Sequence, residues 1–268
     1  MNTFIQFQET VWNHYRHHGR SFPWRTNQTP YRVLVSEIML QQTQAERVVP
    51  YFERFTERFP EIASLSRARL ATVLKLWQGL GYNRRAKLLH DCAKTVVRDY
   101  AGRLLTDEAT LIMLPGIGPY TAAAVAAFAG NRPSTVIETN IRSVYIHHFY
   151  GDREGVTDSE IIPLVEVTVD REHPREWYQA LMDYGAWLKR QGVNPSRRSA
   201  HYVRQAPLKG SNREVRGAII RVLTQKKSLN LQELPRQTGL SPNRVRRALG
   251  QLVEEGLVRQ KGDVLRLF

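Results

Sequence analysis

Hydrophobic residues recur at helical spacing along most of the chain. Residues 2–18 predict one amphipathic helix, whose apolar stripe contains Phe4, Phe7, Val11, Trp12 and Tyr15. After an extended linker at 20–25, the same period predicts further helices at 31–48, 51–59, 70–76, 86–100, 107–113 and 121–127. Glycine and proline residues separate these segments. The pattern therefore predicts an all-α fold for this part of the chain.

A glycine-rich turn joins the last two of these helices, with Thr106 as the expected N-cap of the first. In this turn, residues 114–120, Gly116 and Gly118 permit backbone conformations closed to other residues, while flanking prolines stiffen it. The pattern predicts a helix-hairpin-helix whose second helix points its first amides outward, where they can bind a phosphate without regard to sequence. An ordinary αα-hairpin is the alternative.

The predicted helix 31–48 carries an acidic residue on its apolar face. Glu37 has apolar residues one turn before and one turn after it, so its carboxyl should face the core, where desolvation raises its pKa. A solvated surface is the commoner place for a helical glutamate. Here the polar run 41–44 follows it, and a proton donor beside side-chain amides that can bind a base edge would suit nucleobase chemistry.

A second glycine-punctuated turn lies at residues 77–83, before a basic helix start at Arg84, Arg85 and Lys87. Leu80 and Tyr82 in this turn could push into a base stack while the neighbouring cations hold phosphates. The alternative is a core turn in which Trp77 and Leu80 are buried.

A second acidic residue, Glu138, stands where an apolar run ends and a predicted helix at 140–145 begins. The dipole and amides of that helix should hold its carboxylate ionised, the opposite of the environment expected for Glu37. Alone, such a glutamate is typical of a helix cap. Two carboxylates with pKa values pushed apart can cleave a glycosidic bond, one protonating the leaving group and the other stabilising the oxocarbenium-like cation.

Composition points to a polyanionic partner. The 268 residues are 42% hydrophobic, enough for a sizeable core in one to three domains, and carry a net charge of +14. That surplus favours nucleic acid over a membrane surface, because no apolar run approaches the ~20 residues of a membrane span and no signal peptide is recognisable. The single cysteine, Cys92, excludes a disulfide framework and favours a reducing, cytoplasmic, nucleoid-associated setting. The crowded His14, His17 and His18 lack partners at ligand spacing, so we expect a solvated helix end.

Four motifs occur in the order found in the helix-hairpin-helix (HhH-GPD) DNA glycosylases: residues 36–44, 77–82, 114–122 and 182–186. The chain resembles this superfamily over residues 20–190, and most of all its MutY-type adenine glycosylase branch. The resemblance implies a two-lobed helical domain at residues 1–207, with DNA across the cleft and the target base flipped into a pocket. A six-helix lobe would occupy residues 30–132, and the second lobe residues 1–29 with 133–207.

The resemblance also implies roles for particular residues. Glu37 would protonate the leaving base, Glu138 would stabilise the cation and the incoming water, and Tyr120 would line the catalytic pocket. The residues expected to contact the base pair or the opened strand are Gln41, Gln42, Leu80, Tyr82 and Asn140. Those expected to bind phosphates are Gly116, Gly118, Tyr120, Thr121, Arg84, Arg85, Lys189, Arg190, Arg197 and Arg198.

The chain departs from the family pattern in its carboxylate and its cofactor loop. Where the family usually has an aspartate, this chain has Glu138, whose side chain is one methylene longer. The longer side chain puts the geometry of the carboxylate or the identity of the substrate in question. The iron–sulfur loop expected after Gly185 and Ala186 is replaced by a cysteine-free basic segment. We therefore expect no 4Fe–4S cluster and no other metal or cofactor, with a monovalent cation at the hairpin as the one candidate.

Two further departures concern the substrate and the reaction. The domain with which adenine glycosylases read oxidised guanine is not recognisable, so specificity for adenine opposite oxoguanine has little support. Tyr120 stands where endonuclease III relatives carry a lysine nucleophile. Because a tyrosine cannot form a Schiff base, we expect a monofunctional glycosylase without imine-based strand cleavage.

Residues 208–268 predict a separate unit. Helices at 213–225 and 231–238 precede a third that Ser241 and Pro242 begin, and residues 258–268 alternate as a small hairpin with Gly262 and Asp263 at its tip. This resembles a winged helix-turn-helix, whose third helix enters a major groove while the wing touches the backbone. The expected DNA contacts are Asn243, Arg244, Arg246 and Arg247. A protein-docking module without DNA contact is the alternative.

The sequence thus predicts a monomeric base-excision repair glycosylase acting on double-stranded DNA, with adenine in a mismatch as the first candidate substrate. Thymine, uracil or another deaminated base in a mismatch is the alternative on the same fold, because Tyr120 fits either pocket. A catalytically silent DNA-binding protein or a regulator belongs to another class, and neither would need a buried Glu37.

Overall fold

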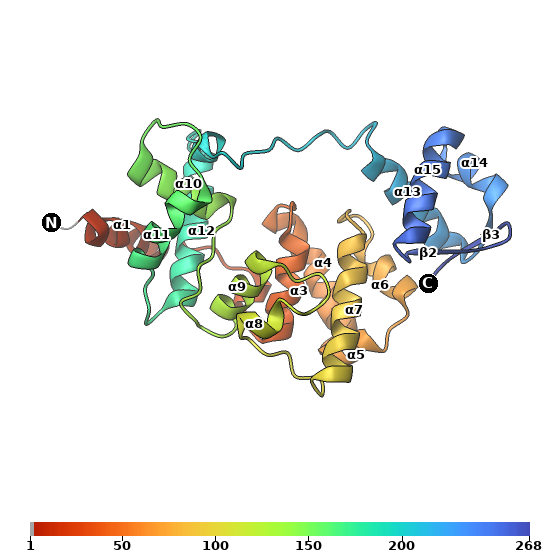
Figure 1. Cartoon of the computed structure of the whole chain (residues 1–268), viewed down its shortest axis with the longest axis horizontal. Coiled ribbons are helices and arrows are strands. Elements are labelled where there is room, and N and C mark those ends of the chain that lie inside the picture. Colours follow the sequence, from red (N-terminus) through yellow and green to blue (C-terminus); the bar gives the residue numbers. More distant parts are fainter. Residues whose placement is uncertain (1–2) are drawn as a thin grey trace. The chain divides into compact units, whose positions relative to one another are not determined.

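The computed structural model describes residues 3–268. Its regular secondary structure is helical apart from a small sheet near the C-terminus (Figure 1). This confirms the predicted fold class. The chain divides into two compact units. The first unit contains the described residues up to Leu34 together with Leu105–Met113 and Ile117–Arg204. The second contains Val35–Leu104, Leu114–Gly116 and Gln205–Phe268.

The first unit is built around α12. Its elements are α1 (Thr3–His18), α2 (Pro23–Thr26), α8 (Glu108–Leu111), α9 (Pro119–Phe128), α10 (Thr139–Tyr145), the π-helical turn η1 (Ile146–Tyr150), α11 (Asp158–Thr168), α12 (Pro174–Arg190) and the 3-10 turn η2 (Pro195–Arg198). Helix α12 contacts α1, α9 and α10. Its Trp177, Tyr178 and Leu181 are fully buried, so the apolar face of this helix forms the centre of the unit.

Helix α9, which is rich in alanine, packs tightly against its neighbours. Every residue from Thr121 to Phe128 is buried, so the helix is enclosed on all sides rather than on one face. Alanine suits this position because it favours helix and its short side chain lets neighbouring elements approach closely.

Helix α3 (Pro30–Leu40) begins in the first unit and continues in the second. The other helices of residues 35–104 are α4 (Ala45–Arg58), α5 (Ile62–Ser66), α6 (Leu70–Trp77) and α7 (Arg84–Asp99). The C-terminal segment adds α13 (Asn212–Lys226), β1 (Leu229–Asn230), η3 (Leu231–Glu233), α14 (Leu234–Thr238), α15 (Pro242–Glu254), β2 (Val258–Lys261) and β3 (Val264–Leu267).

The C-terminal segment has the predicted winged-helix architecture. Helices α13 and α15 pack through buried residues such as Ile219 and Leu249. The strands form an antiparallel sheet in the order β1-β3-β2, with Leu229 paired to Leu265 and Val258 to Leu267. The hairpin predicted at 258–268 is confirmed, whereas the two-residue strand β1 was too short for the sequence to reveal.

The winged helix packs on residues 35–104 within the second unit. Helix α13 contacts α6, and the backbone N of Ala71 donates to the carbonyl of Phe268 over 2.9 Å. The predicted boundaries, at residues 30–132, at 1–29 with 133–207, and at 208–268, stay predictions.

Some predicted elements differ from the observed ones. The helix expected over 31–48 breaks after Leu40, because Gln42 adopts a left-handed φ of 54° and residues 41–44 form a turn before α4. The N-cap of α8 is Asp107 rather than Thr106, since the Asp107 carboxylate accepts from the Thr110 amide. Part of the linker expected at 20–25 is helical and belongs to α2. Residue 2 of the predicted first helix lies outside the described residues.

Candidate active site and DNA-binding surface

Glu37 lies in the interior of α3, where only 6% of it is exposed. Its neighbours Val35, Ile38 and Met39 are buried as well. The prediction that Glu37 faces the core is confirmed. Burial among apolar groups disfavours a charged carboxylate, and an acid that must deliver a proton benefits from that environment.

Arg85 fixes the end of the helix that carries Glu37. Its Nη1 donates to the carbonyl oxygens of Ile38 at 2.8 Å, Met39 at 3.2 Å and Gln41 at 2.5 Å. Burial lowers the pKa of the guanidinium to about 10. These carbonyls engage its guanidinium, and phosphate binding by Arg85 stays a prediction. Arg85 caps α3 within one turn of Glu37.

Glu138 is the N-cap of α10, as the capping interpretation predicted. Its Oε1 accepts from the amides of Asn140 at 2.8 Å and Ile141 at 3.0 Å, and Oε2 accepts from Asn140 Nδ2 at 3.2 Å. Burial raises the pKa of Glu138, and the amide donors and the Arg142 charge oppose this only in part. The expectation that the helix start keeps this pKa low is therefore wrong in direction, because desolvation outweighs the donors.

Gly185 lets α12 press against the first turn of α10. A β-carbon at Gly185 would collide with the carbonyl of Asn140 and would come within 2.8 Å of its Cβ. Because Asn140 supplies two of the donors to Glu138, the lack of a side chain at Gly185 fixes the site of that carboxylate. The motif at residues 182–186 includes Gly185, but nothing in the sequence indicated its contact with Asn140.

Asp183 anchors the chain before α3 to α12. It is 1% exposed and accepts from the backbone N and Nε of Arg20, each at 2.8 Å, and from Nη1 and Nη2 of Arg25 at 2.8 and 2.9 Å. Burial alone would raise the pKa of Asp183, but the hydrogen bonds and charges of the two arginines together lower it. The motif at 182–186 marked this residue, but nothing in the sequence identified its partners.

The glycine-rich hairpin has the predicted backbone geometry. Gly116 has a φ of 77°, and a β-carbon there would lie 2.6 Å from Cβ of Leu88, so only glycine fits. Gly118 is the N-cap of α9, and both glycines are exposed. Tyr120 is partly exposed, while Thr121 is 3% exposed. Contacts from this turn to a phosphate would therefore come from backbone rather than from the Thr121 side chain.

The turn at residues 77–83 is buried on one side and accessible on the other. Leu80 is 5% exposed and Trp77 is fully buried, so both side chains lie in the core, and the insertion of Leu80 into a base stack stays a prediction. Tyr82 is partly exposed with a left-handed φ of 49°. Gln42 in the turn after α3 is exposed and also left-handed, while Gln41 is partly exposed. Such backbone strain in non-glycine residues is concentrated at functional sites.

The predicted phosphate-binding residues outside the hairpin differ in their accessibility. The exposed ones are Arg84, Lys189, Arg190 and Arg197. Arg198 is less exposed, because it donates to the carbonyl of Gly151 and pairs with Asp152 at 3.3 Å, and its phosphate contact stays a prediction.

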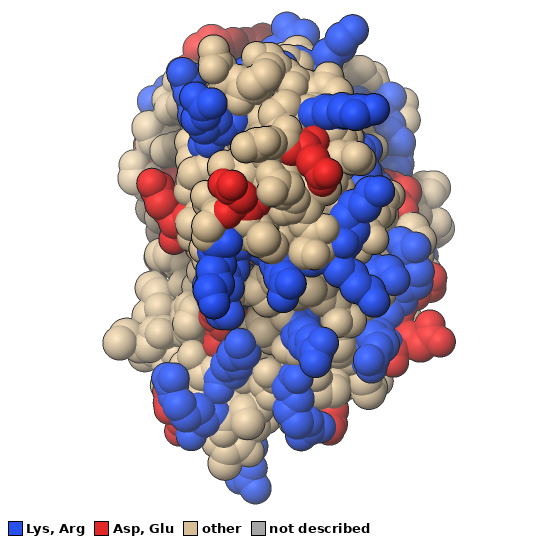
Figure 2. Space-filling model, turned by 90° about the vertical axis from the view of Figure 1, so that its right-hand side faces the viewer, with Lys and Arg blue, Asp and Glu red and all other residues tan. Residues whose placement is uncertain are grey.

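Basic side chains spread over the face of the molecule seen from the winged-helix end (Figure 2). On α15, Asn243, Arg246 and Arg247 are exposed, as the predicted DNA contact requires. Arg244 is half-buried and pairs with Glu214 at 3.2 Å, which links α15 to α13, and its contact with DNA stays a prediction. The exposed part of the predicted surface is therefore the one formed by Asn243, Arg246 and Arg247.

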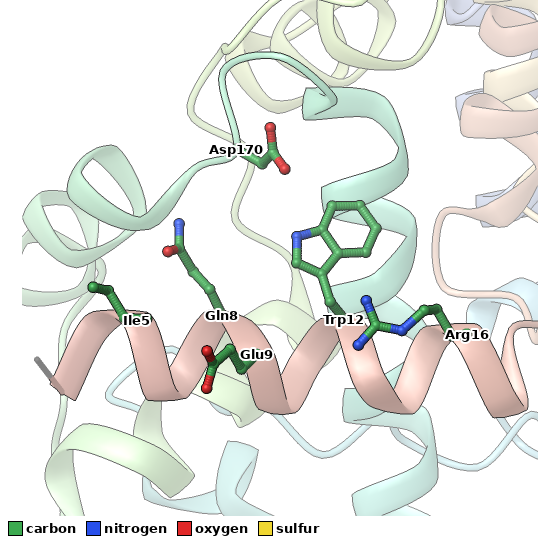
Figure 3. A pocket seen from close by; sticks show the side chains of 6 residues that line it. All are labelled: Ile5, Gln8, Glu9, Trp12, Arg16 and Asp170. Atoms are coloured by element: carbon green, nitrogen blue, oxygen red, sulfur yellow. The ribbon is translucent and has the colours of Figure 1, made fainter. Parts of the chain in front are cut away.

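The residues of the candidate site do not line the pocket shown in Figure 3. That pocket is formed by α1 and the loop before α12, and its lining is Ile5, Gln8, Glu9, Trp12, Arg16 and Asp170. Within residues 3–268, no group of three or more His, Cys, Asp or Glu side chains is placed to hold a metal ion. No helix in the described part of the chain is long and apolar enough to cross a membrane.

Two parts of the chain match known protein families. Residues 35–171 match the HhH-GPD superfamily base excision DNA repair protein family, and residues 217–262 match the IclR helix-turn-helix domain. The first match contains Glu37, the hairpin and Glu138, and the second contains α14, α15 and the wing strand β2.

The relatives are adenine glycosylases, and a solved neighbour is a thymine glycosylase. The adenine DNA glycosylase of Mycolicibacterium smegmatis is 34% identical over 267 residues, covering 93% of this chain and 91% of the relative. That of Buchnera aphidicola subsp. Baizongia pistaciae is 38% identical over 69% of this chain, which spans 54% of that relative's length. A thermostable thymine-DNA glycosylase superposes with a TM-score of 0.61 at 26% identity, covering 69% of this chain and 86% of the neighbour.

Proposed function

This chain belongs to the HhH-GPD superfamily of base excision DNA repair proteins, and from that premise we propose that it is a DNA glycosylase that removes adenine from mismatched double-stranded DNA. The observation that carries this proposal is Glu37, an acid that is 6% exposed in the helix that precedes the exposed glutamine turn. The adenine glycosylase of M. smegmatis supports the choice of base, since its similarity extends over 93% of this chain.

The reaction needs one proton and one water. With the adenosine flipped out of the duplex, Glu37 gives its proton to a ring nitrogen of the base as the N-glycosidic bond lengthens, so the bonding electrons leave with a neutral adenine. The deoxyribose becomes an oxocarbenium-like cation that the Glu138 carboxylate stabilises. Water then adds to the anomeric carbon and loses its proton to Glu138, whose raised pKa suits an acceptor.

The residues of this chain do not fit the cofactor of the superfamily's iron–sulfur branch. A 4Fe–4S cluster is held by four cysteine thiolates, and the chain has Cys92 alone, buried in α7. The exposed cations Lys189, Arg190 and Arg197 occupy the end of α12 and the turn after it. We propose that these cations hold the DNA backbone there, without a cluster, and that a monovalent cation at the hairpin is the only candidate ligand.

The proposed enzyme is a monomer that releases the base without cutting the strand. Tyr120, at the start of α9, has no amine to form an imine with the sugar. The winged helix adds a second duplex contact through Arg246 and Arg247 of α15, both of which are exposed.

A second candidate substrate is thymine or uracil opposite guanine. It is favoured by the 26% identity to the thermostable thymine-DNA glycosylase, and Tyr120 is compatible with either pocket. Both candidates use Glu37 and Glu138 in the same roles, so the identity of the released base decides between them.

A panel of duplexes tests the proposal. Adenine opposite oxoguanine, adenine opposite guanine, and thymine, uracil or hypoxanthine in mismatches are incubated with excess enzyme, and the released base is identified. We expect adenine release from wild type and its loss in Glu37→Gln with duplex binding retained. Glu57→Gln is the matched control, because it removes one carboxylate from the exposed face of α4. Pyrimidine release alone would establish the second candidate, and no release from any duplex would refute glycosylase activity.

A further inference from the structure

Two residues of the C-terminal segment hold the side chain of Tyr82. Its hydroxyl accepts hydrogen bonds from Gln205 Nε2 and Arg213 Nη1, both over 2.7 Å. The Arg213 guanidinium also lies 5.1 Å from the centre of the tyrosine ring, and that of Arg85 lies 5.3 Å from it. All four residues belong to the second compact unit.

The same contacts extend to the exposed glutamine turn. Gln205 Nε2 is 3.4 Å from Oε1 of Gln42, and Arg213 Nη2 donates to the carbonyl of Ala206 over 2.5 Å. Arg213 thus ties the start of α13 to the linker, and Gln205 ties the linker to both Gln42 and Tyr82. Gln42 and Tyr82 both have a left-handed backbone conformation, and in the proposed function both lie in turns that face DNA.

We propose that Arg213 and Gln205 are positioning residues that set Tyr82 and Gln42 in place for insertion into the opened base stack. The inference rests on the proposed function, because base excision is what opens the stack. A tyrosine on a solvent-exposed turn would otherwise sample several rotamers, and ordering it would cost free energy during DNA binding. Two hydrogen bonds and two stacked guanidinium groups fix the rotamer beforehand.

A phosphate-binding role for Arg213 predicts different behaviour from positioning. An arginine that only attracts the DNA backbone can be replaced by lysine, since either cation neutralises a phosphate. An arginine that both stacks on Tyr82 and donates to its hydroxyl cannot, because lysine lacks the planar fork. The winged helix would then contribute to the rate of base release, and not only to affinity.

Single-turnover kinetics at saturating enzyme separate the two roles. We expect Arg213→Ala to slow base release about three- to tenfold, with Arg213→Lys restoring DNA affinity but not the rate. Tyr82→Phe should cause a similar loss, and the double variant should lose no more than either single one. Arg221→Ala is the matched control, because it removes an exposed arginine from the same helix and should leave the rate unchanged. Independent, additive losses or a faster Arg213→Ala variant would overturn the proposal.

Two readouts do not depend on base release. In the Glu37→Gln background, 2-aminopurine placed beside the mismatch should brighten on binding, and Arg213→Ala should reduce this unstacking signal. In the free protein, the urea midpoints of Arg213→Ala, Tyr82→Phe and the double variant should be non-additive. If wild type releases no base while the urea midpoints stay coupled, the proposed function has failed but the contact stands. Base release with additive midpoints would refute the positioning role alone.

Discussion

The two acidic residues of the proposed site are buried by different means. Glu37 lies in the interior of α3 among apolar neighbours and is 6% exposed. Glu138 stands at the start of α10, where two backbone amides and the Asn140 side chain donate to it. Apolar packing favours the protonated form, which a general acid needs, whereas directed donors orient a carboxylate toward a developing cation. The comparison teaches that one carboxyl is placed in a helix interior, between buried apolar neighbours along the chain, and the other at a helix start, where amide donors orient it.

After replacement of Glu37 itself, the largest effect is expected from neutralising Glu138, whose carboxylate accepts hydrogen bonds at the start of α10. Glu138→Gln keeps an oxygen that can cap α10 but removes the negative charge, so base release should fall about 10²–10³-fold in single-turnover kinetics. Glu138→Asp keeps the charge and a side chain that can cap α10, so its rate should stay within about tenfold of wild type. A fully active Glu138→Gln would remove this residue from the chemistry.

The next largest effect should come from the packing behind Glu138. Gly185→Ala forces Asn140 away from α12, which moves two donors of the carboxylate and should slow base release by up to about 10²-fold. Gly217→Ala is the matched control, because a β-carbon at that helical glycine meets no atom within 4 Å and should leave the rate unchanged. Equal rates for the two variants, measured at saturating enzyme, would show that α12 does not position the site.

These two sites also show what the sequence could and could not predict. The burial of Glu37 followed from its spacing to apolar residues on one helix, a property of local periodicity. The cap by Glu138 followed from its place before a helix. The contact between Gly185 and Asn140 joins residues far apart in sequence and depends on how closely two helices approach, which periodicity does not specify. The direction of the Glu138 pKa was mispredicted for the same reason, because desolvation depends on the surrounding packing.

The winged helix gives a second such contrast. Its helices and hairpin were predictable from local patterns, and the exposed Arg246 and Arg247 were identified correctly as accessible. The intramolecular partners of Arg85 and Arg244 were not predictable, because a basic residue near a helix start looks the same in sequence whether it meets solvent, a carbonyl or a carboxylate. Which group an arginine side chain contacts depends on the tertiary structure, and the number of charges in the sequence does not predict it.

A smaller effect should appear in the pH dependence of stability. The pKa of Glu138 is raised above its ordinary 4.5, so the folded state binds this proton more tightly than the unfolded chain does. Its stabilising contribution is therefore present below that value and is lost as pH rises through the folded pKa. Glu138→Gln should be more stable than wild type at higher pH, by about 1.4 kcal/mol for each unit of pKa shift, and the difference should vanish in acid. Urea midpoints across pH measure this, and a constant difference would contradict it.

The smallest expected effect concerns the winged-helix surface. Arg246→Ala and Arg247→Ala should each weaken duplex binding with little dependence on sequence and reduce the slope of log K against log salt by about 1. Wild type should lose about a thousandfold or more in affinity between roughly 50 and 200 mM salt if six or more phosphates are neutralised. Unchanged salt slopes in both variants would favour a protein-docking role for α15.

The pH dependence of base release tests the central claim most directly. If the buried Glu37 delivers the proton, the single-turnover rate on the duplex that wild type cleaves best should fall as pH rises and Glu37 loses its proton. Glu37→Gln should bind the same duplex, release base about 10²–10⁴-fold more slowly and lack that alkaline decline. Glu37→Gln with the wild-type rate, or with the wild-type pH profile, would contradict the account.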